Sequence, residues 1–182
     1  MLRSKVNSNL VKQILTLRYS NEIKSTIPKL SWKDFITKNE NISAEEIEKI
    51  IQNYIRNNIK NSRKTKVALA LSGGIDSTLV LNSLIKSAPH VKIKTLSVKF
   101  NESFDETKYA SKIAEHLGID NQIIFIPNYL RELPMAISIV KLPFWDLHWY
   151  YLAKKAKTIS KIIIAGDGGD ELFAGYTFRY KK

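Results

Sequence analysis

The fold is decided by residues 67–78, which read VALALSGGIDST. The first five residues form a continuous apolar run, as expected for a strand that is buried on both faces of a parallel sheet. A Ser-Gly-Gly turn follows, and residues 78–87 then have the pattern of a helix. Glycines in such a turn let successive backbone N–H groups point inward, and the amino terminus of the helix adds a positive dipole end. The stretch therefore predicts a phosphate or pyrophosphate site at the end of a strand.

Side chains in the same turn support this prediction. Ser72, Ser77 and Thr78 offer hydroxyl donors to a phosphate. Asp76 would repel a bare phosphate, so we expect its carboxylate to act through a magnesium ion. The turn has neither the Gly-x-x-x-x-Gly-Lys-Ser nor the Gly-x-Gly-x-x-Gly pattern of other nucleotide-binding loops. A purely structural turn, with Asp76 as a helix cap, is the alternative interpretation.

A second glycine-rich segment, GDGGDELFAG at residues 166–175, follows the apolar run at residues 162–165. Six of the chain's seven glycines lie in these two segments. The second segment also places three carboxylates, Asp167, Asp170 and Glu171, within five residues. Because neighbouring ionised carboxylates repel one another, a bound magnesium ion would account for the group. For Glu171, a structural role at the start of a helix is equally consistent with the sequence.

Strand-like and helix-like segments alternate along the chain from residue 67 onward. Before them, Ser43 and Glu46 form a capping-box pair at the start of a helix with an apolar stripe. This alternation predicts an α/β fold: a Rossmann-like, doubly wound parallel sheet that binds ligands at the carboxyl ends of its strands. Residues 1–42 are predicted to be an N-terminal arm with little regular structure, and residues 43–182 to form one domain. The predicted strands are 67–71, 91–100, 122–126 and 162–165, and the predicted helices are 78–87, 105–117, 128–140 and 145–157.

The composition argues against several classes of function. The chain has 182 residues and a formal net charge of +12, but no basic run is interleaved with aromatic residues. A solvated basic surface is therefore favoured over nucleic-acid binding. The chain has no cysteine, which excludes disulfides, thiolate metal sites and a cysteine nucleophile within it. No apolar run reaches the roughly 20 residues that span a bilayer, and no signal peptide is recognisable, so we expect no membrane association and a cytoplasmic location.

Two further groups of residues receive structural interpretations. The three histidines are too scattered along the sequence to predict a metal site. An aromatic cluster lies near residues 144–151, where core packing is favoured over a role as a substrate wall. Its members are Phe144, Trp145, Trp149, Tyr150 and Tyr151.

Several segments carry a resemblance to one family. The Ser-Gly-Gly-x-Asp-Ser string at residues 72–77 matches the pyrophosphate-binding loop of the ATP pyrophosphatase (PP-loop) superfamily. Residues 163–176, 104–110 and 114–118 resemble signature segments of asparagine synthetases and the related β-lactam synthetases, and Leu17-Arg18-Tyr19 resembles the segment that joins their two halves. The resemblance runs from about Leu17 to Tyr180. It implies the synthetase domain of the asparagine synthetase family, with an adenine nucleotide alpha hydrolase-like fold.

The resemblance also implies a role for each matching residue. Asp76 and Asp170 would hold Mg²⁺ on the pyrophosphate, Asp167 would be the general base of an ammonia step, and Asp105 would lie near the substrate or the metal. Ala165 stands where the family usually has Ser, which removes one hydroxyl contact to the nucleotide. The positions implied to bind ATP or pyrophosphate are Ala70, Leu71, Ser72, Gly73, Gly74, Asp76, Ser77, Val98, Ala165 and Gly166.

The implied activity is that of an ATP-dependent carbon–nitrogen ligase. ATP would activate the side-chain carboxylate of L-aspartate as an adenylate, releasing pyrophosphate, and ammonia would then displace AMP. Because the chain lacks cysteine, we expect it not to contain the family's glutaminase nucleophile, so ammonia would be free or come from a separate glutaminase chain. Neither Lys181 nor Lys182 matches the family's downstream catalytic lysine, so we expect the domain to be shorter than its relatives at the C-terminus.

Other interpretations of the same sequence stay open. One is a nucleotide-binding module without catalysis, motivated by the expected absence of the glutaminase and of the downstream lysine. Another is a subunit that a second chain completes, and a second copy of this chain is a further partner to consider. The last interpretation is an RNA-modifying member of the same superfamily. The basic charge motivates it, but the second glycine-rich segment disfavours it.

Overall fold

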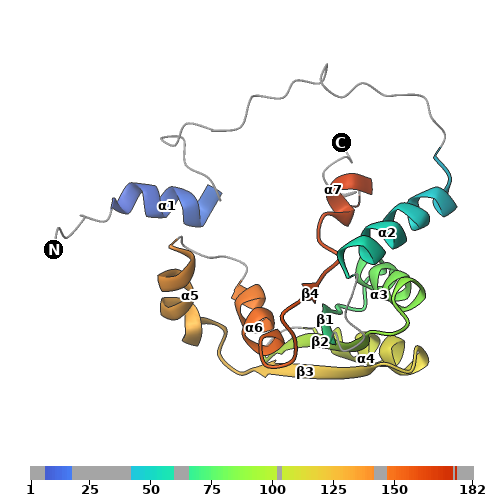
Figure 1. Ribbon diagram of the computed structural model, residues 1–182. Helices are drawn as coiled ribbons and strands as arrows, with labels where there is room; N and C mark the ends of the chain where they lie inside the picture. Colours follow the sequence, from blue (N-terminus) through green and yellow to red (C-terminus); the bar gives the residue numbers. More distant parts are fainter. Residues whose placement is uncertain are drawn as a thin grey trace, which may run out of the picture. The chain divides into compact units, whose positions relative to one another are not determined.

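The computed structural model describes residues 7–17, 42–59, 66–101, 104–141, 147–173 and 175 (Figure 1). These residues fall into two units: α1 and α5 belong to the first, and the sheet with its remaining helices belongs to the second. The elements are α1 (Ser8–Leu17), α2 (Ala44–Asn58), β1 (Lys66–Ala70), α3 (Ile75–Ser87), β2 (Lys92–Phe100), α4 (Thr107–His116), β3 (Asp120–Ile126), a 3₁₀ helix (Tyr129–Glu132), α5 (Leu133–Val140), α6 (Leu147–Ala156), β4 (Ile163–Ile164) and α7 (Gly169–Phe173).

The second unit is built on a four-stranded sheet in the order β3-β2-β1-β4. All three neighbouring pairs are parallel, and β1 pairs with β2 from Lys66↔Lys92 to Ala70↔Leu96. On its other side β1 pairs with β4, where Leu69 is the partner of Ile164. The predicted α/β fold with a parallel sheet is confirmed. Its two glycine-rich segments follow β1 and β4, so they leave the sheet from adjacent strands at the same edge.

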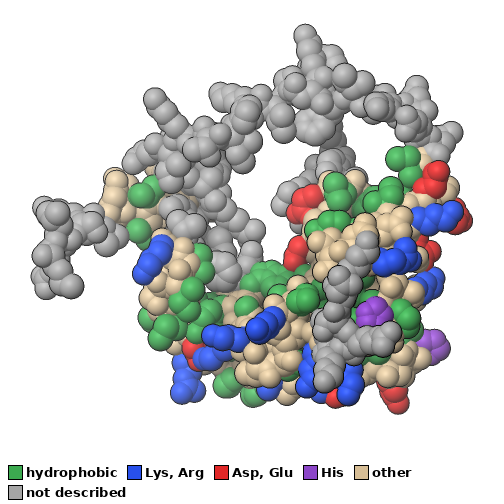
Figure 2. Space-filling view, viewed as in Figure 1, with side chains coloured by type: hydrophobic (Ala, Val, Ile, Leu, Met, Phe, Trp, Pro, Cys, Tyr) green, Lys and Arg blue, Asp and Glu red, His purple; other side chains and the backbone are tan. Residues whose placement is uncertain are grey.

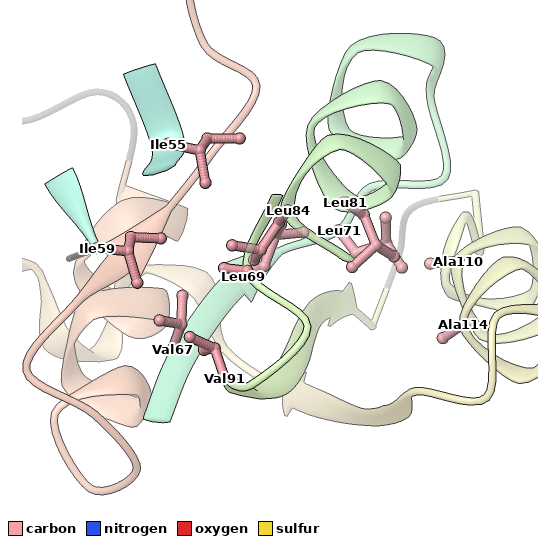
Figure 3. Close-up of a cluster of buried hydrophobic side chains, with 11 residues drawn as sticks. Ile55, Ile59, Val67, Leu69, Leu71, Leu81, Leu84, Val91, Ala110 and Ala114 are labelled. Carbon is pink, nitrogen blue, oxygen red and sulfur yellow. The ribbon is translucent and has the colours of Figure 1, made fainter. Parts of the chain in front are cut away.

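Alternate residues of β1 pack against helices on the two faces of the sheet. Val67 and Leu69 are fully buried in a cluster that α2, α3 and α4 complete (Figure 3). Ala68 is buried in a second cluster with Leu96 of β2 and Leu152 of α6. A strand with helices on both faces has no polar side, which explains why the run is apolar throughout. This packing fixes the point at which β1 ends and the first glycine turn begins.

The predicted capping box at the start of α2 is confirmed. The hydroxyl of Ser43 accepts a hydrogen bond from the backbone N–H of Glu46 at 3.2 Å, and the Glu46 carboxylate accepts one from the backbone N–H of Ser43 at 2.8 Å. The buried side chains of Ile55 and Ile59 then lie against the β1 and α3 side of the first core cluster (Figure 3). Reciprocal capping of this kind fixes where the helix begins.

Several helices differ from the prediction. The segment predicted to have little regular structure contains α1, whose start is capped by Asn7: its side-chain oxygen accepts hydrogen bonds from two following backbone N–H groups at 3.0 and 3.1 Å. Helix α3 begins at Ile75 instead of Thr78, because Gly74 is already its extended N-cap residue. The helix predicted over residues 128–140 is divided into a 3₁₀ turn and α5, since Pro134 favours the first turn of a helix.

In the described part of the chain, no helix has both the length and the apolar character that a membrane span requires. Residues 145 and 146 of the helix predicted at 145–157 lie outside the described residues. From residue 147 onward the predicted helix corresponds to α6. Helix α7 was not predicted.

Candidate functional site

The first glycine turn, residues 71–74, is fixed by hydrogen bonds on both sides. At its start, the backbone N–H of Leu71 donates to the carbonyl of Leu96 at 2.8 Å, and the Ser97 hydroxyl donates to the Leu71 carbonyl at 2.7 Å. The turn is thereby tied to β2. Gly73 has a φ of +86°, a backbone conformation that other residues adopt at a cost. The turn is thus shaped by the backbone before any ligand is considered.

Hydroxyl groups close the other side of the turn. The oxygens of Ser72 and Ser77 lie 3.1 Å apart, and the Ser72 oxygen also accepts a hydrogen bond from the backbone N–H of Gly74 at 3.2 Å. Thr78 donates to the Gly74 carbonyl at 2.7 Å. Two of the predicted phosphate donors, Ser72 and Ser77, therefore hold one another in place at the amino end of α3. This rigidity suits an anion site, since its donors do not need to reorganise when the ligand arrives.

The second glycine-rich segment lies directly against the first. A Cβ atom on Gly166 would approach the backbone nitrogen of Ser77 to 2.8 Å, and one on Gly169 would approach the Asp76 carboxylate carbon to 2.6 Å. At Gly166 the neighbouring atoms are backbone, so a side chain there would force the two segments apart; at Gly169 the neighbour is the Asp76 carboxylate, which would have to turn away from its present position. The chain also returns on itself at Asp170, whose carbonyl accepts a hydrogen bond from the backbone N–H of Gly175 at 3.0 Å. The two motifs therefore form one site.

A cleft of about 570 Å³ opens between these two segments, β2 and α6. Its lining residues are Ala70, Leu71, Ser72, Asp76, Ser77, Leu96, Ser97, Val98, Phe100, Glu106, Thr107, His148, Trp149, Leu152, Ala165, Gly166, Asp167, Gly168, Gly169, Asp170 and Glu171. Polar groups gather around the glycine segments, whereas apolar side chains from β2 and α6 line the rest. The volume lies within the range of small-molecule sites, roughly 300–1,000 Å³.

The charge of the cleft is opposite to that of the chain. Five carboxylates line it, from the residues Asp76, Glu106, Asp167, Asp170 and Glu171, and none of its described lining residues is Lys or Arg. A polyphosphate would therefore meet repulsion here unless cations accompanied it. Among the described residues, no group of three or more His, Asp or Glu side chains could hold a metal by itself. Mg²⁺, however, is commonly bound by one or two carboxylates together with substrate phosphates, and Asp76 and Asp170 beside the anion turn fit that arrangement.

Asp105 lies apart from this cleft, in an ion pair at the end of β2. Its carboxylate accepts a hydrogen bond from the Lys99 ammonium at 2.7 Å and two from Thr107, one from the backbone N–H at 3.2 Å and one from the hydroxyl at 2.5 Å. The hydrogen bond from Lys99 lowers the pKa of Asp105, the bonds from Thr107 act in the same direction, and burial opposes them. These contacts hold the first turn of α4, where Glu106 and Thr107 do line the cleft.

Most residues implied to bind ATP or pyrophosphate line the cleft, as do Asp167 and Asp170. Gly73 and Gly74 do not; they line a shallow groove between α3 and α4 instead. Glu106 and Thr107 also line the cleft; they lie in the segment 104–110 that carries the family resemblance, but neither was predicted as a site residue. Trp149, interpreted as core packing, both packs on the second core cluster and lines the cleft, and Phe144 and Trp145 lie outside the described residues.

The basic side chains do not gather at this cleft. On the face shown in Figure 2, Lys and Arg side chains stand in small groups over several elements, with acidic side chains among them. Some of these lysines pair with carboxylates, as Lys86 does with Glu48 at 2.7 Å. This distribution favours a solvated surface over a continuous nucleic-acid track on that face.

Several known proteins are similar in sequence to this chain. A family model described as asparagine synthase matches residues 52–182. Asparagine synthetase [glutamine-hydrolyzing] 1 of Bacillus subtilis (strain 168) is 34% identical over 125 residues, which are 65% of this chain and 20% of that protein. The chain thus spans about a fifth of the length of this curated relative. The residues matched by the family model include both glycine-rich segments and the β2–α4 region between them.

Two solved structures share the fold. The glutamine-dependent NAD⁺ synthetase from Acinetobacter baumannii, in complex with ADP, has a TM-score of 0.54 and 19% identity, covering 72% of this chain and 27% of that chain. The NH₃-dependent NAD synthetase from Campylobacter jejuni has a TM-score of 0.50 and 22% identity, covering 72% of this chain and 60% of that chain. Their likeness extends to the parallel sheet and its helices.

Proposed function

Because the chain belongs to the asparagine synthase family, we propose that its cleft binds ATP with Mg²⁺ and serves an ATP-dependent carbon–nitrogen ligase. The pyrophosphate of ATP lies in the turn after β1, where Ser72, Ser77 and the amino end of α3 face it. Asp76 and Asp170 hold Mg²⁺, which neutralises the phosphate charge in this acidic cleft. The backbone at Ala70, Val98, Ala165 and Gly166 contacts the adenosine part.

The proposed reaction has two steps. An oxygen of the L-aspartate side-chain carboxylate attacks the α-phosphorus of ATP, the bond between the α- and β-phosphates breaks, and pyrophosphate remains in the turn. Ammonia then attacks the activated carbonyl carbon, AMP leaves, and Asp167 accepts the proton released from nitrogen. Asp105, held by Lys99 and Thr107, keeps the start of α4 beside this centre. Residues 43–182 form the nucleotide-binding domain, and residues 1–42 form an arm.

One observation carries the proposal above the others. Gly166 and Gly169 bring the acidic segment after β4 into contact with Asp76 and Ser77 in the turn after β1. A structural glycine turn would need no second glycine-rich segment packed against its carboxylate. The contact brings the hydroxyls of the first turn and the carboxylates of the second segment to one cleft, which supports the proposal because a Mg²⁺–polyphosphate ligand needs both kinds of group.

The test is the release of AMP and pyrophosphate by the purified chain given ATP, Mg²⁺, L-aspartate and ammonium. We expect AMP formation that depends on aspartate and stops when Mg²⁺ is removed with a chelator. Asp76→Asn should lower it at least about 100-fold while thermal unfolding stays unchanged. Asp120→Asn is the matched control, because Asp120 pairs with Lys94 where β3 begins, at the opposite edge of the sheet. Full activity of Asp76→Asn would contradict the proposal.

A further inference from the structure

The apolar end of the cleft is formed by two elements. Leu96 and Val98 project from β2, and Trp149 and Leu152 project from α6, all of them lining the cleft. Trp149 also packs on the buried cluster that contains Leu96 and Leu152, so its position is fixed by the core. The glycine segments, with their carboxylates and hydroxyls, lie at the other end. The cleft therefore has a polar end suited to phosphates and an apolar end suited to a flat ring.

Helix α6 is held in place at its first turn by the segment after β3. The hydroxyl oxygen of Tyr129 accepts a hydrogen bond from the backbone N–H of Leu147 at 2.8 Å, and this N–H is among the first of the helix, where no intrahelical acceptor exists. In return, the hydroxyl of Tyr151 on α6 donates to the Tyr129 carbonyl at 3.3 Å. The two hydrogen bonds run in opposite directions and join the same two segments.

The ring of Tyr129 is itself fixed against the sheet. It meets Phe100 at the end of β2 edge to face, with ring centroids 5.2 Å apart and planes at 74°. Phe100 lines the cleft, as does His148, whose ring centroid lies 5.5 Å from that of Trp149. Tyr129 thus connects the end of β2 to the turn of α6 that carries His148 and Trp149.

From this geometry we infer that Trp149 is the wall against which the base of the bound nucleotide lies, and that Tyr129 is the residue that positions it. The inference rests on the proposed nucleotide site and names the side chains that recognise the base. A purine has two apolar faces, and an indole ring matches them by stacking. Tyr129 does not reach the base; it fixes the first turn of α6, so that the indole is already in place when the nucleotide enters.

Two probes separate the ends of the cleft. AMP keeps the base and lacks the pyrophosphate, whereas inorganic pyrophosphate with Mg²⁺ lacks the base. We expect Trp149→Leu to weaken AMP binding about tenfold, as the loss of one stacking partner does, and to leave pyrophosphate binding within about twofold. Trp149→Phe keeps an aromatic face and should bind AMP within about threefold of the original chain.

Tyr129→Phe tests positioning, because it keeps the ring that meets Phe100 and removes the hydroxyl that accepts the hydrogen bond from the Leu147 N–H. It should weaken AMP binding about threefold and leave pyrophosphate binding unchanged, since the lost hydrogen bond is at the base end alone. The control is Tyr54→Phe, an exposed tyrosine on α2 outside the cleft, which should change neither affinity. A merely structural role for Tyr129 would lower both affinities together.

Isothermal titration of each variant with both probes, together with its thermal unfolding, decides the matter. The inference is overturned if Trp149→Leu binds AMP like the original chain, or if it loses AMP and pyrophosphate binding equally. Unchanged AMP binding by Tyr129→Phe would overturn the positioning role alone. If the original chain binds neither probe, the proposed function fails and the inference fails with it, an outcome distinct from the first two.

Discussion

The two glycine-rich segments differ in how they are held, although they follow adjacent strands and meet in one cleft. The turn after β1 begins at buried Leu71 and is followed by buried Ser77 in α3, and its hydroxyl and backbone groups are hydrogen-bonded to β2 and α3. In the segment after β4, none of the described residues from 165 to 175 is buried, and α7 is only five residues long. The conformation of the first segment is fixed by its own hydrogen bonds and burial, whereas that of the second segment depends on its contact with the first.

This difference assigns distinct tasks to the two halves of the site. A phosphate turn works best when its donors are fixed beforehand, since reorganisation would cost binding free energy. The segment after β4 supplies negative charge through Asp167, Asp170 and Glu171. These carboxylates stabilise a bound phosphate only when a cation lies between them. The contact of Gly166 and Gly169 with Ser77 and Asp76 brings this charge next to the first turn.

The largest effect is expected where this contact is broken. Gly169→Ala would place a Cβ atom 2.6 Å from the carboxylate carbon of Asp76, so the Asp76 carboxylate must be displaced by roughly 1 Å. Because a displacement of that size in a catalytic group lowers rates about 100-fold, AMP formation should fall by that factor. Steady-state AMP release with saturating Mg²⁺ and ATP measures it.

The neighbouring glycine provides the matched control for Gly169. Gly168 has a φ of +92° and open space around its Cβ position, so Gly168→Ala strains the backbone without a collision. It should cost AMP formation far less than Gly169→Ala does. Equal losses in the two variants would show that contact with Asp76 is not what matters.

The next largest effect concerns the fixed turn, and it is an effect on stability. Gly73→Ala combines a φ of +86° with a Cβ atom 2.9 Å from the backbone nitrogen of Ala110. We expect a loss of about 2–3 kcal/mol in the free energy of unfolding, measured by urea denaturation. Gly118→Ala, with a φ of +68° and open space, carries the backbone strain alone and should lose only about 1 kcal/mol. Similar losses would contradict the tight packing of the turn against α4.

A substitution remote from both segments separates the global stability of the fold from ligand binding. Ser43→Ala removes the capping box of α2 and should lower the free energy of unfolding by about 1 kcal/mol. ATP affinity, measured by titration, should stay the same, because α2 does not line the cleft. A parallel loss of affinity would mean that the site follows global stability instead of the local contacts described above.

The smallest effect is expected at the ion pair beside the cleft, where water screens the charges. The folded-state pKa of Asp105 is lowered, chiefly by Lys99, so the pair stabilises the fold above the ordinary Asp pKa of about 3.8 and loses that contribution as the pH falls through the lower folded value. Asp105→Asn should therefore be less stable than the original chain at pH 7, and the difference should shrink below pH 4. A difference that is constant with pH would show that the charge of Asp105 is not involved.

Much of the fold could be predicted from the sequence because its signals are local. The apolar run at residues 67–71, the Ser43–Glu46 pair and the alternation of strands and helices each depend on neighbouring residues alone. Helix α1 could have been predicted from the spacing of its apolar positions 10, 11, 14 and 17. Helix α3 begins early because Gly74 has an extended backbone and is its N-cap residue. Glycine has no side chain from which this conformation could be predicted.

The site was predictable where a motif carried it and not where tertiary packing did. Ser72, Asp76 and Asp170 stand out in sequence because glycines surround them. Trp149 reaches the cleft only because α6 packs on β2, and Glu106 only because Asp105 fixes the start of α4. No spacing along the chain encodes the approach of Trp149 to the cleft, because only the fold brings α6 against β2. The contact of Asp105 with Thr107 is local, but nothing in it indicates that Glu106 faces the cleft.

If the two segments act as one Mg²⁺–ATP site, the carboxylates of Asp76 and Asp170 must be coupled in ligand binding. A double-mutant cycle on these two residues measures that coupling. Titration calorimetry with ATP and Mg²⁺ would give the affinity of the original chain, Asp76→Asn, Asp170→Asn and the double variant. If both carboxylates hold the same ion, the second substitution adds little to the first, and the coupling free energy is at least about 1.4 kcal/mol, a factor of ten in affinity. Losses that simply add, with coupling below about 0.5 kcal/mol, would show that the segments act independently and would contradict the account.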